Sequence, residues 1–464
     1  MRNKKFISGL LSILTVNTIG LFLGLINNIV LPKFLSIDSY SHIKTFHLYY
    51  NFLGIFHLGT IDAISIKYGG IKYDNLNKKE LACESSAIRC FLFVEQIVMM
   101  AVAFIIESKS VLLVCMTILF TNMISFYKIL FQATGEFKKY SRIIIGVSLL
   151  KFFSNIILIF FFQSDNYMVY ILMYILSDIL VVAILEIKYT GNKMFICQNI
   201  LSNIVIGIKN GFLLLIGNIM VNFLSSIDRW FVKFGARIED FAFYSFAVTI
   251  EQMLINITKP FQISLYNYFC INKEDINGII VVRRYLMIIS ALFVCCLFPI
   301  KEFIAVFLHK YNPSIPVIVL LFASQIWSIN VNSIYINLYK AYGKQNVYFN
   351  RVLFVVLIAF LLDAIGYFFI KKNIIYAVMT LISNIIWYII SCFDFKNYFP
   401  KIKEWIYIVL ITSCFIVLGL KENNLVNMFI YIFLTFFLTF VLFGDEFKNI
   451  LWYIRYLHKK VFQR

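Results

Sequence analysis

Apolar residues fill long runs along this chain, and polar residues collect in short segments between the runs. Each run is long enough to cross a bilayer as one helix, for which about 20 residues suffice. The connectors between them leave almost no room for a soluble domain. The pattern predicts an all-α polytopic membrane protein with fourteen helices: Phe6–Leu31, Phe46–Ile66, Arg89–Ile106, Val111–Phe131, Ile143–Phe162, Tyr167–Leu185, Gly211–Phe231, Phe241–Lys259, Tyr285–Phe307, Pro316–Leu338, Arg351–Ile370, Ile374–Cys392, Trp405–Leu420 and Leu425–Phe443.

Composition and charge agree with this class. Of 464 residues, 61% are hydrophobic and only 14% are charged, which no ordinary soluble domain matches. With the N-terminus placed in the cytoplasm, the cytoplasmic segments hold about 30 Lys and Arg and the periplasmic ones about 11, as the positive-inside rule requires. We therefore expect both termini in the cytoplasm. The net charge of +18 reflects topology, and no nucleic-acid partner is expected.

Two short patterns recur six helices apart, at an offset of roughly 200 residues, which is typical of a parallel repeat. I-D-S-Y at 37–40 matches I-E-D-F at 238–241, and A-x-G-x4-Y occurs at 133–140 and again at 341–348. The repeat predicts two six-helix lobes around a central cavity. The expected divisions are an N-lobe at 1–190, a C-lobe at 191–395, and two extra helices with a basic cytoplasmic tail at 396–464.

Polar residues on one face of a membrane helix must avoid lipid, because unpaired polar groups are costly there. In the run 206–231, Asn218, Asn222, Ser225 and Arg229 fall within a sector of roughly 60° on a continuous helix. The tenth helix carries Gln325, Ser328, Asn330, Asn332 and Ser333. These amides and hydroxyls suit a sugar or hydrated-ion path, and bonding between helices is the equal alternative. From both helices we take Arg229, Asn218, Asn222, Gln325 and Asn332 as candidate cavity residues.

Ionisable residues inside the membrane cost about 2.5–3.5 kcal/mol each on insertion scales, so each needs an explanation. Lys151 is the only cation near the middle of a predicted helix, and Ser148 and Asn155 share its side. A cavity site for an anionic substrate and an ion pair with Asp178 on the next helix both remain open for it. The candidate carboxylates for ion coupling or internal ion pairs are Asp62, Glu95, Asp178, Glu251 and Asp363.

The chain carries no G-x-x-x-x-G-K-[ST] loop, no His/Glu metal motif and no nucleophile elbow. None of its nine cysteines falls in a predicted periplasmic loop, so no disulfide is expected. Buried charges of both signs, a repeat and no catalytic motif together indicate a secondary transporter. We expect no enzymatic activity, no cofactor and no metal.

Several segments resemble bacterial polysaccharide flippases of the Wzx type, in the multidrug/oligosaccharidyl-lipid/polysaccharide (MOP) exporter superfamily. The similarity covers most of the chain at low motif specificity. Its segments are K-F-L-S at 33–36, F-H-L-G-T-I-D at 56–62, I-K-Y-G-G at 66–70, Q-A-T-G-E-F at 132–137, Asp228-Arg229 and Y-S-F-A at 244–247. The resemblance implies a MATE-like fold in the bacterial inner membrane. It also implies flipping of undecaprenyl-diphosphate-linked repeat units of O-antigen, for lipopolysaccharide, or of capsule.

The same resemblance implies, as partners, the lipid-linked oligosaccharide, membrane lipids, a polysaccharide polymerase and a chain-length regulator. Two alternatives share the fold: a multidrug/cation antiporter and a flippase for the peptidoglycan lipid precursor. The first helix has Asn17, Asn27 and Asn28 but no central charge, whereas flippases of the peptidoglycan precursor tend to be more cationic there. This departure weakens the peptidoglycan alternative.

Overall fold

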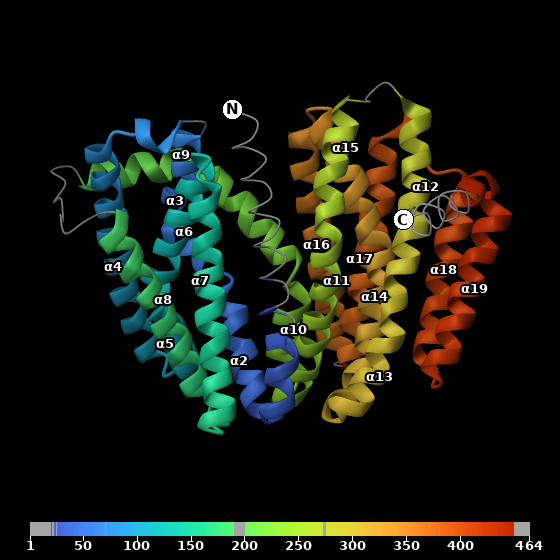
Figure 1. Cartoon of the computed structure of the whole chain (residues 1–464), viewed down its shortest axis with the longest axis horizontal. Coiled ribbons are helices and arrows are strands. Elements are labelled where there is room, and N and C mark those ends of the chain that lie inside the picture. The colour runs from blue at the N-terminus through green and yellow to red at the C-terminus, as the bar shows by residue number, and fades with distance from the viewer. Residues whose placement is uncertain are drawn as a thin grey trace, which may run out of the picture. The chain divides into compact units, whose positions relative to one another are not determined.

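The computed structural model describes residues 20, 23–24, 26–69, 71–189, 200–271, 275–370 and 372–449, and every element in that part of the chain is helical. Its helices fall into two compact units, Met1–Ser226 and Ile227–Arg464. Unit 1 contains α2 (Ile37–Tyr50), η1 (Leu53–His57), α3 (Thr60–Tyr68), η2 (Tyr73–Asn75), α4 (Lys78–Ile105), α5 (Lys109–Cys115), α6 (Ile118–Ala133), α7 (Phe137–Ile156), η3 (Ile157–Phe161), α8 (Tyr167–Tyr189) and α9 (Ile200–Leu224) (Figure 1).

Unit 2 begins directly after this last helix of unit 1. It contains α10 (Ile227–Gly235), α11 (Ile238–Ile271), α12 (Ile276–Phe293), η4 (Val294–Cys296), α13 (Leu297–Phe307), η5 (His309–Ser314), α14 (Ile315–Asn330), η6 (Val331–Tyr335), α15 (Ile336–Ala341), α16 (Gln345–Phe369), α17 (Asn373–Asp394), η7 (Lys396–Tyr398), α18 (Ile402–Leu420) and α19 (Asn424–Leu442). The short elements η3 and η6 are π-helical turns that continue a longer helix, and the other η elements are 3₁₀ turns.

Eleven helical segments of the described chain are long and apolar enough to cross a membrane. They correspond to eleven of the fourteen predicted helices. Of the other three, the first lies largely outside the described residues, the second is interrupted, and the eighth is α11, a single helix of 34 residues. The prediction of an all-α, multi-pass membrane protein is confirmed.

The predicted second helix, 46–66, is wrong as one continuous element. After α2 the chain makes the 3₁₀ turn η1, and Leu58 and Gly59 then adopt positive φ values of 46° and 90° before α3 begins. A left-handed residue ends a helix, and glycine adopts this conformation without a steric penalty. Because of this break, α3 is a helix of its own and not a continuation of α2.

Helix α9 crosses α3 at a contact between two glycines. A Cβ added to Gly211 would lie 1.8 Å from the carbonyl oxygen of Gly59, so neither position has room for a side chain. Figure 1 shows α9 running obliquely across the other helices of unit 1, and it packs on α3 and α4. By these contacts α9 is part of unit 1, whereas the repeat assigns it to the lobe at 191–395. The lobe boundaries remain predictions.

The predicted seventh helix, 211–231, is also two elements. Helix α9 ends at Leu224, and α10 starts at Ile227 after a turn in which Ser225 and Ser226 donate their hydroxyls to the carbonyl of Asn222. Serine hydroxyls that bond to nearby backbone carbonyls compete with the helix and favour such turns. The single polar face drawn through Asn218 and Arg229 is therefore wrong, because Arg229 belongs to another helix.

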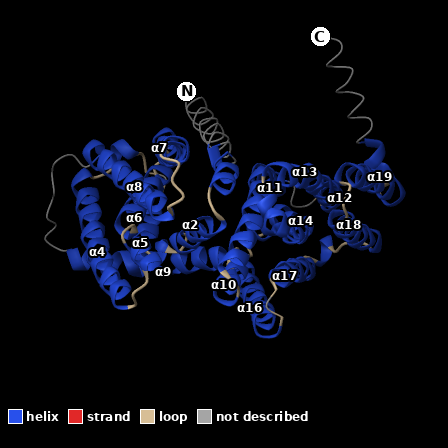
Figure 2. Ribbon diagram, turned by 90° about the horizontal axis from the view of Figure 1, so that it is seen from below, coloured by secondary structure: helices blue, strands red, loops and turns tan. Residues whose placement is uncertain are grey.

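Helix α14, in the middle of the span His309–Ala341, lies at the centre of unit 2, since 89% of the membrane-crossing stretch of that span is buried in protein. Figure 2 shows it end-on among α11, α12, α13 and α17, and α18 packs on it as well. Pairs of aromatic rings fill the layer between these helices, for example Trp327 against Tyr388. Aromatic pairs of this kind contribute beyond their buried area.

An ionic cluster fastens the two C-terminal helices to α12. The fully buried Glu404 of α18 accepts hydrogen bonds from Arg283 and from Arg284 Nε, the latter at 2.7 Å, and Arg284 Nη1 also bonds Glu446 at 2.7 Å. We call Arg283, Arg284, Glu404 and Glu446 the terminal clamp. Because the clamp joins residues far apart in sequence, it fixes α18 and the segment after α19 within unit 2.

One further expectation fails in unit 1. Cys83, near the start of α4, is disulfide-bonded. Seven other cysteines are free. The prediction that the chain contains no disulfide is therefore wrong.

Candidate functional site

The central charge of unit 1 is an ion pair between α7 and α8. Lys151 Nζ lies 2.9 Å from Asp178 Oδ1 and 3.1 Å from Oδ2. The hydroxyl of Tyr50, from α2, donates to Asp178 Oδ2 at 2.9 Å and accepts from Lys151 Nζ at 3.3 Å. Asp178 is 1% exposed and Lys151 18%. The ammonium therefore keeps some access to its surroundings, whereas the carboxylate has none.

A second polar layer lies one helical turn away on the same helices. Asn155 follows Lys151 by four residues, and Tyr174 precedes Asp178 by four, so both pairs share a helix face. The Tyr174 hydroxyl donates to Asn155 Oδ1 at 2.8 Å, Asn155 Nδ2 donates to Asn27 at 2.7 Å, and the His47 ring lies 5.6 Å from that of Tyr174. The two layers place polar side chains of α2, α7 and α8 at successive levels of these helices.

Asp62 connects α3 to α9. Asn218 Nδ2 donates to Asp62 Oδ1 at 3.2 Å, while the other oxygen, Oδ2, is buried with no hydrogen-bond partner among the described residues. His57 Nδ1 accepts from the backbone N–H of Gly59, which leaves Nε2 to face Asp62 Oδ2 at 3.9 Å. This distance is too long for a hydrogen bond. Asp62 is thus a buried carboxylate supported by one neutral amide.

Unit 2 buries carboxylates next to neutral donors. Glu251 Oε1 of α11 accepts from Gln325 Nε2 of α14 at 2.6 Å, and Asp228 Oδ2 of α10 accepts from the Tyr244 hydroxyl at 2.7 Å. Asp228 Oδ1 also accepts from the backbone N–H of Arg229 at 2.7 Å. Both acids are almost fully buried, at 6% and 7% exposed. We call Asp228, Glu251 and Asp363 the acidic cluster.

Asp363, the third member, is 2% exposed, and its Oδ1 has no hydrogen-bond partner in the described structure. It lies on α16 and repels the charge of Asp228 across the space between their helices. The Tyr376 hydroxyl, which also interacts with Asp363, has no hydrogen-bond partner either. A buried carboxylate without a donor is expensive unless it is protonated or binds a cation.

The structure brings together three pairs of the predicted site residues: Lys151 with Asp178, Asn218 with Asp62, and Gln325 with Glu251. Arg229 lies at the start of α10, where its charge acts on Asp228 and Glu251.

The remaining candidates stay apart from these groups. Asn332 donates to Ser328 on its own helix at 3.0 Å, Asn222 is exposed, and Glu95 Oε2 on α4 is buried without a partner. Their cavity and coupling roles remain predictions.

The sequence reasoning missed the tyrosines that complete these sites, namely Tyr50, Tyr174 and Tyr244. Each donates its hydroxyl to a polar residue on another helix. With 28 tyrosines in the sequence, residue type carries no signal. Helical spacing does give a signal for Tyr50, because Tyr50 follows His47 by three residues and so shares its helix face.

No family model matches the chain, and neither does any curated protein sequence. Solved structures do match. A structure of the lipid II flippase MurJ in an inward closed conformation aligns with a TM-score of 0.70 at 12% identity, covering 93% of this chain and 99% of that one. The chain has a MurJ-like fold. An outward-facing structure of a multidrug resistance MATE family transporter of the MOP superfamily aligns more weakly, with a TM-score of 0.48 at 12% identity over 87% of this chain and 96% of that one.

Proposed function

We propose that the protein is a flippase that moves a lipid-linked oligosaccharide, an undecaprenyl-diphosphate-linked repeat unit of O-antigen or capsule, across the bacterial inner membrane by alternating access. The observation that carries the proposal is the MurJ-like fold, which extends over nearly the whole of both chains. The Wzx-type segments of the sequence support the choice of repeat unit. A polysaccharide polymerase and a chain-length regulator are the expected partners downstream.

The chemistry of such a substrate fits the polar groups of the chain. A polyprenyl tail can stay in lipid during the movement, so only the diphosphate and the sugars need a polar route. A cation is the natural partner of a diphosphate, and amides suit sugar hydroxyls. Lys151 supplies the cation in unit 1, and Asn218 and Gln325 supply amides in units 1 and 2.

The ion pair also suggests how an ion gradient drives the cycle. Lys151 cannot bind a diphosphate strongly while Asp178 neutralises it at 2.9 Å. Protonation of Asp178 would release the ammonium, and the Tyr50 hydroxyl, which contacts both groups, would remain to hold either form. In this scheme proton binding and substrate binding favour the same state, which is the thermodynamic condition for coupling.

One alternative is favoured by a specific observation. The best-aligned structure reported above is of a lipid II flippase, so the peptidoglycan precursor is the second candidate substrate. Both candidates are polyprenyl-linked diphosphates and differ in their sugars. Complementation of strains that lack one or the other flippase therefore distinguishes between the two substrates.

The test uses two bacterial strains, one lacking its repeat-unit flippase and one depleted of its lipid II flippase. We expect the wild-type chain to restore polysaccharide in the first strain only. Rescue of the second strain alone would replace the proposed substrate with lipid II. Rescue of neither strain by a chain that is inserted at normal abundance would reject the flippase function, and drug export by the same cells would then indicate an antiporter.

Variants at the ion pair test the role of Lys151. Lys151→Ala should insert normally but fail to complement, and Lys151→Arg should be partly active because it keeps the charge. Arg351→Ala is the matched control, since it breaks another ion pair, with Asp394 at 2.8 Å, in which Arg351 is 42% exposed. If a Lys151→Ala/Asp178→Ala double variant recovers both abundance and full activity, the pair is structural and does not bind the substrate.

A further inference from the structure

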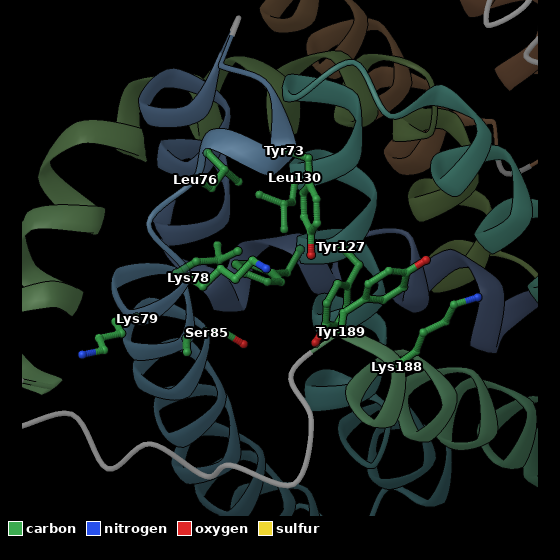
Figure 3. A pocket seen from close by; sticks show the side chains of 12 residues that line it. Tyr73, Leu76, Lys78, Lys79, Ser85, Tyr127, Leu130, Lys188 and Tyr189 are labelled. Carbon is green, nitrogen blue, oxygen red and sulfur yellow. The ribbon is translucent and has the colours of Figure 1, made fainter.

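A cavity of about 520 Å³ opens at the end of unit 1 where η2, the start of α4, and the last turns of α6 and α8 meet. Its volume lies in the range of small-molecule sites, roughly 300–1,000 Å³. By the predicted topology this is the cytoplasmic end. We call it the lysine–tyrosine pocket, after the side chains labelled in Figure 3: Tyr73, Leu76, Lys78, Lys79, Ser85, Tyr127, Leu130, Lys188 and Tyr189.

The pocket gathers positive charge that its own helices do not neutralise. Lys78, Lys79 and Lys188 form no ion pair with any described residue, although acids lie close to them in sequence. Glu80 and Glu84 are both bonded to Lys67, and these bonds raise the pKa of Lys67 despite the burial, which alone would lower it.

The acidic residue nearest to Lys188 in the sequence is likewise bonded to another basic residue. Glu186, two residues before it on α8, accepts a hydrogen bond from Arg89 of α4 at 2.6 Å. Three lysines that line the pocket therefore have no acidic partner among the described residues. Such a site attracts an anion, since each anion–ammonium hydrogen bond is stronger than a neutral one.

Two side chains of the pocket are oriented so that both can contact one anionic group. Figure 3 shows the Lys78 ammonium and the Tyr73 hydroxyl directed into the pocket, whereas the ammonium groups of Lys79 and Lys188 point outward on opposite sides. Burial raises the pKa of Tyr73, so its hydroxyl keeps its proton and can donate to an anion. Lys139 lies 4.0 Å above the Tyr73 ring and holds the ring in place.

The position of the pocket favours an anion that is carried by the membrane. Leu180, Ile184 and Ile187 form an exposed apolar stripe along α8, at 45%, 59% and 72% exposure, and this stripe ends at Lys188. Exposed apolar stripes on a membrane helix face acyl chains, and tyrosines and lysines cluster where acyl chains give way to headgroups. Inside the pocket, Leu81, Ala82 and Leu130 add an apolar wall.

We propose that the lysine–tyrosine pocket binds the phosphate headgroup of an anionic phospholipid of the cytoplasmic leaflet. Lys78 and Tyr73 hold the phosphate oxygens, Lys79 and Lys188 add long-range attraction, and the glycerol and first methylenes lie on Leu81 and Leu130. Basic pockets between membrane helices bind acidic headgroups in this way. The site lies in unit 1 alone and does not depend on which lipid the protein transports.

The test is a titration of the purified full-length protein with phosphatidylglycerol, followed by native mass spectrometry, with phosphatidylcholine as the uncharged comparison. We expect wild type to prefer phosphatidylglycerol, and Lys78→Gln and Tyr73→Phe each to weaken that binding, Lys78→Gln by about tenfold, which corresponds to about 1.4 kcal/mol. Lys138→Gln is the matched control, because Lys138 is an exposed lysine at the start of α7 outside the pocket.

Unchanged thermal unfolding of both variants in phosphatidylcholine shows that the fold is intact, which makes the comparison valid. The proposal is overturned if wild type binds the two lipids equally, or if Lys78→Gln binds phosphatidylglycerol as wild type does. It is also overturned as a lipid site if inorganic diphosphate binds at the pocket and phosphatidylglycerol does not displace it, since the anion would then come from solution.

Discussion

The ion pair at the centre of unit 1 and the acidic cluster of unit 2 stabilise buried carboxylates in opposite ways. Unit 1 has a cation and an anion in contact at its centre, Lys151 with Asp178. Unit 2 keeps its closest ion pairs in the terminal clamp, where Arg283 and Arg284 hold Glu404. Its acidic cluster has hydrogen bonds from the hydroxyl of Tyr244 and the amide of Gln325 and forms no ion pair within the described part of the chain, although the charge of Arg229 acts on it.

This difference separates carboxylates that a cation neutralises from carboxylates that no cation pairs with and that a proton or a bound cation can neutralise. A carboxylate in a tight ion pair loses its partner's attraction when it is protonated, so it resists protonation until another anion, such as a substrate diphosphate, takes its place beside the cation. A buried carboxylate whose hydrogen bonds come only from neutral donors gains from protonation or from binding a cation, because either reduces a poorly compensated charge. The acidic cluster is therefore the part of unit 2 that a proton or cation gradient can act on, while the clamp is structural. Four predictions test this contrast.

The largest effect is expected at the terminal clamp. Glu404→Ala leaves the fully buried Arg283 without its anion and leaves Arg284 with Glu446 alone. Removing one partner of a buried ion pair typically costs about 3–5 kcal/mol. We expect a strong fall in abundance and in the unfolding temperature of the detergent-purified protein. Arg351→Ala, which breaks a half-exposed pair, should cost at most about 1 kcal/mol. Equal losses at the two positions would contradict the structural role of the clamp.

Matched amide substitutions should give opposite signs in the two units. Asp178→Asn leaves Lys151 facing a neutral group and should lower stability by about 1–3 kcal/mol. Asp363→Asn removes a carboxylate whose Oδ1 has no partner, so stability should stay the same or rise. Unfolding temperatures of the two variants at neutral pH measure the difference. A clear loss of stability in Asp363→Asn would mean that the carboxylate has an unrecognised partner.

The sequence predicted the helical class, because run length depends only on local composition. It also predicted the face of α7 that carries Lys151 and Asn155, because helical spacing is regular. The breaks at 51–59 and 225–226 could not be predicted in this way. The first depends on the contact of Gly59 with Gly211, far away in the chain, and the second on serine hydroxyls that bond back to the helix. Both breaks lie inside apolar runs that carry no strong turn signal.

The candidate site was predicted in its charged members and missed in its neutral ones. Lys151 and Asp178 stand out because charge is rare in a membrane segment, and their pairing follows from adjacent helices. Tyr50 and Tyr244 do not stand out among 28 tyrosines, although their hydroxyls decide how the carboxylates are stabilised. The terminal clamp was missed because its four residues lie near helix ends, where charge is ordinary.

The third prediction concerns the gradient. If the acidic cluster couples transport to an ion, Glu251→Gln and Asp363→Asn should insert normally and lose most of the dependence on the imposed gradient, by about tenfold in initial rate, or about 1.4 kcal/mol. Transport of a lipid-linked oligosaccharide into proteoliposomes, with and without a pH or sodium gradient, measures this. Gln325→Ala controls for the loss of one hydrogen bond without a change of charge. Unchanged gradient dependence in both variants would remove the acidic cluster from the coupling mechanism.

The smallest effect is expected at Asn218, where unit 1 has a carboxylate of the unit 2 kind. Asn218→Ala removes the amide that Asp62 accepts from at 3.2 Å, a loss of about 1 kcal/mol. Asn222→Ala, one turn further along α9 and exposed, should change nothing. Asn218→Asp should lower stability more than Asn218→Ala does, because two carboxylates would then face each other. Adding Asp62→Asn to Asn218→Asp should restore the contact, because the amide and the carboxylate would have exchanged places. If Asn218→Asp is harmless without that second change, Asp62 is already protonated in the wild type. In that case Asp62 belongs with the acidic cluster, as a carboxylate that a gradient can protonate without displacing a cation, and the difference between the units is confined to the ion pair of Lys151 with Asp178.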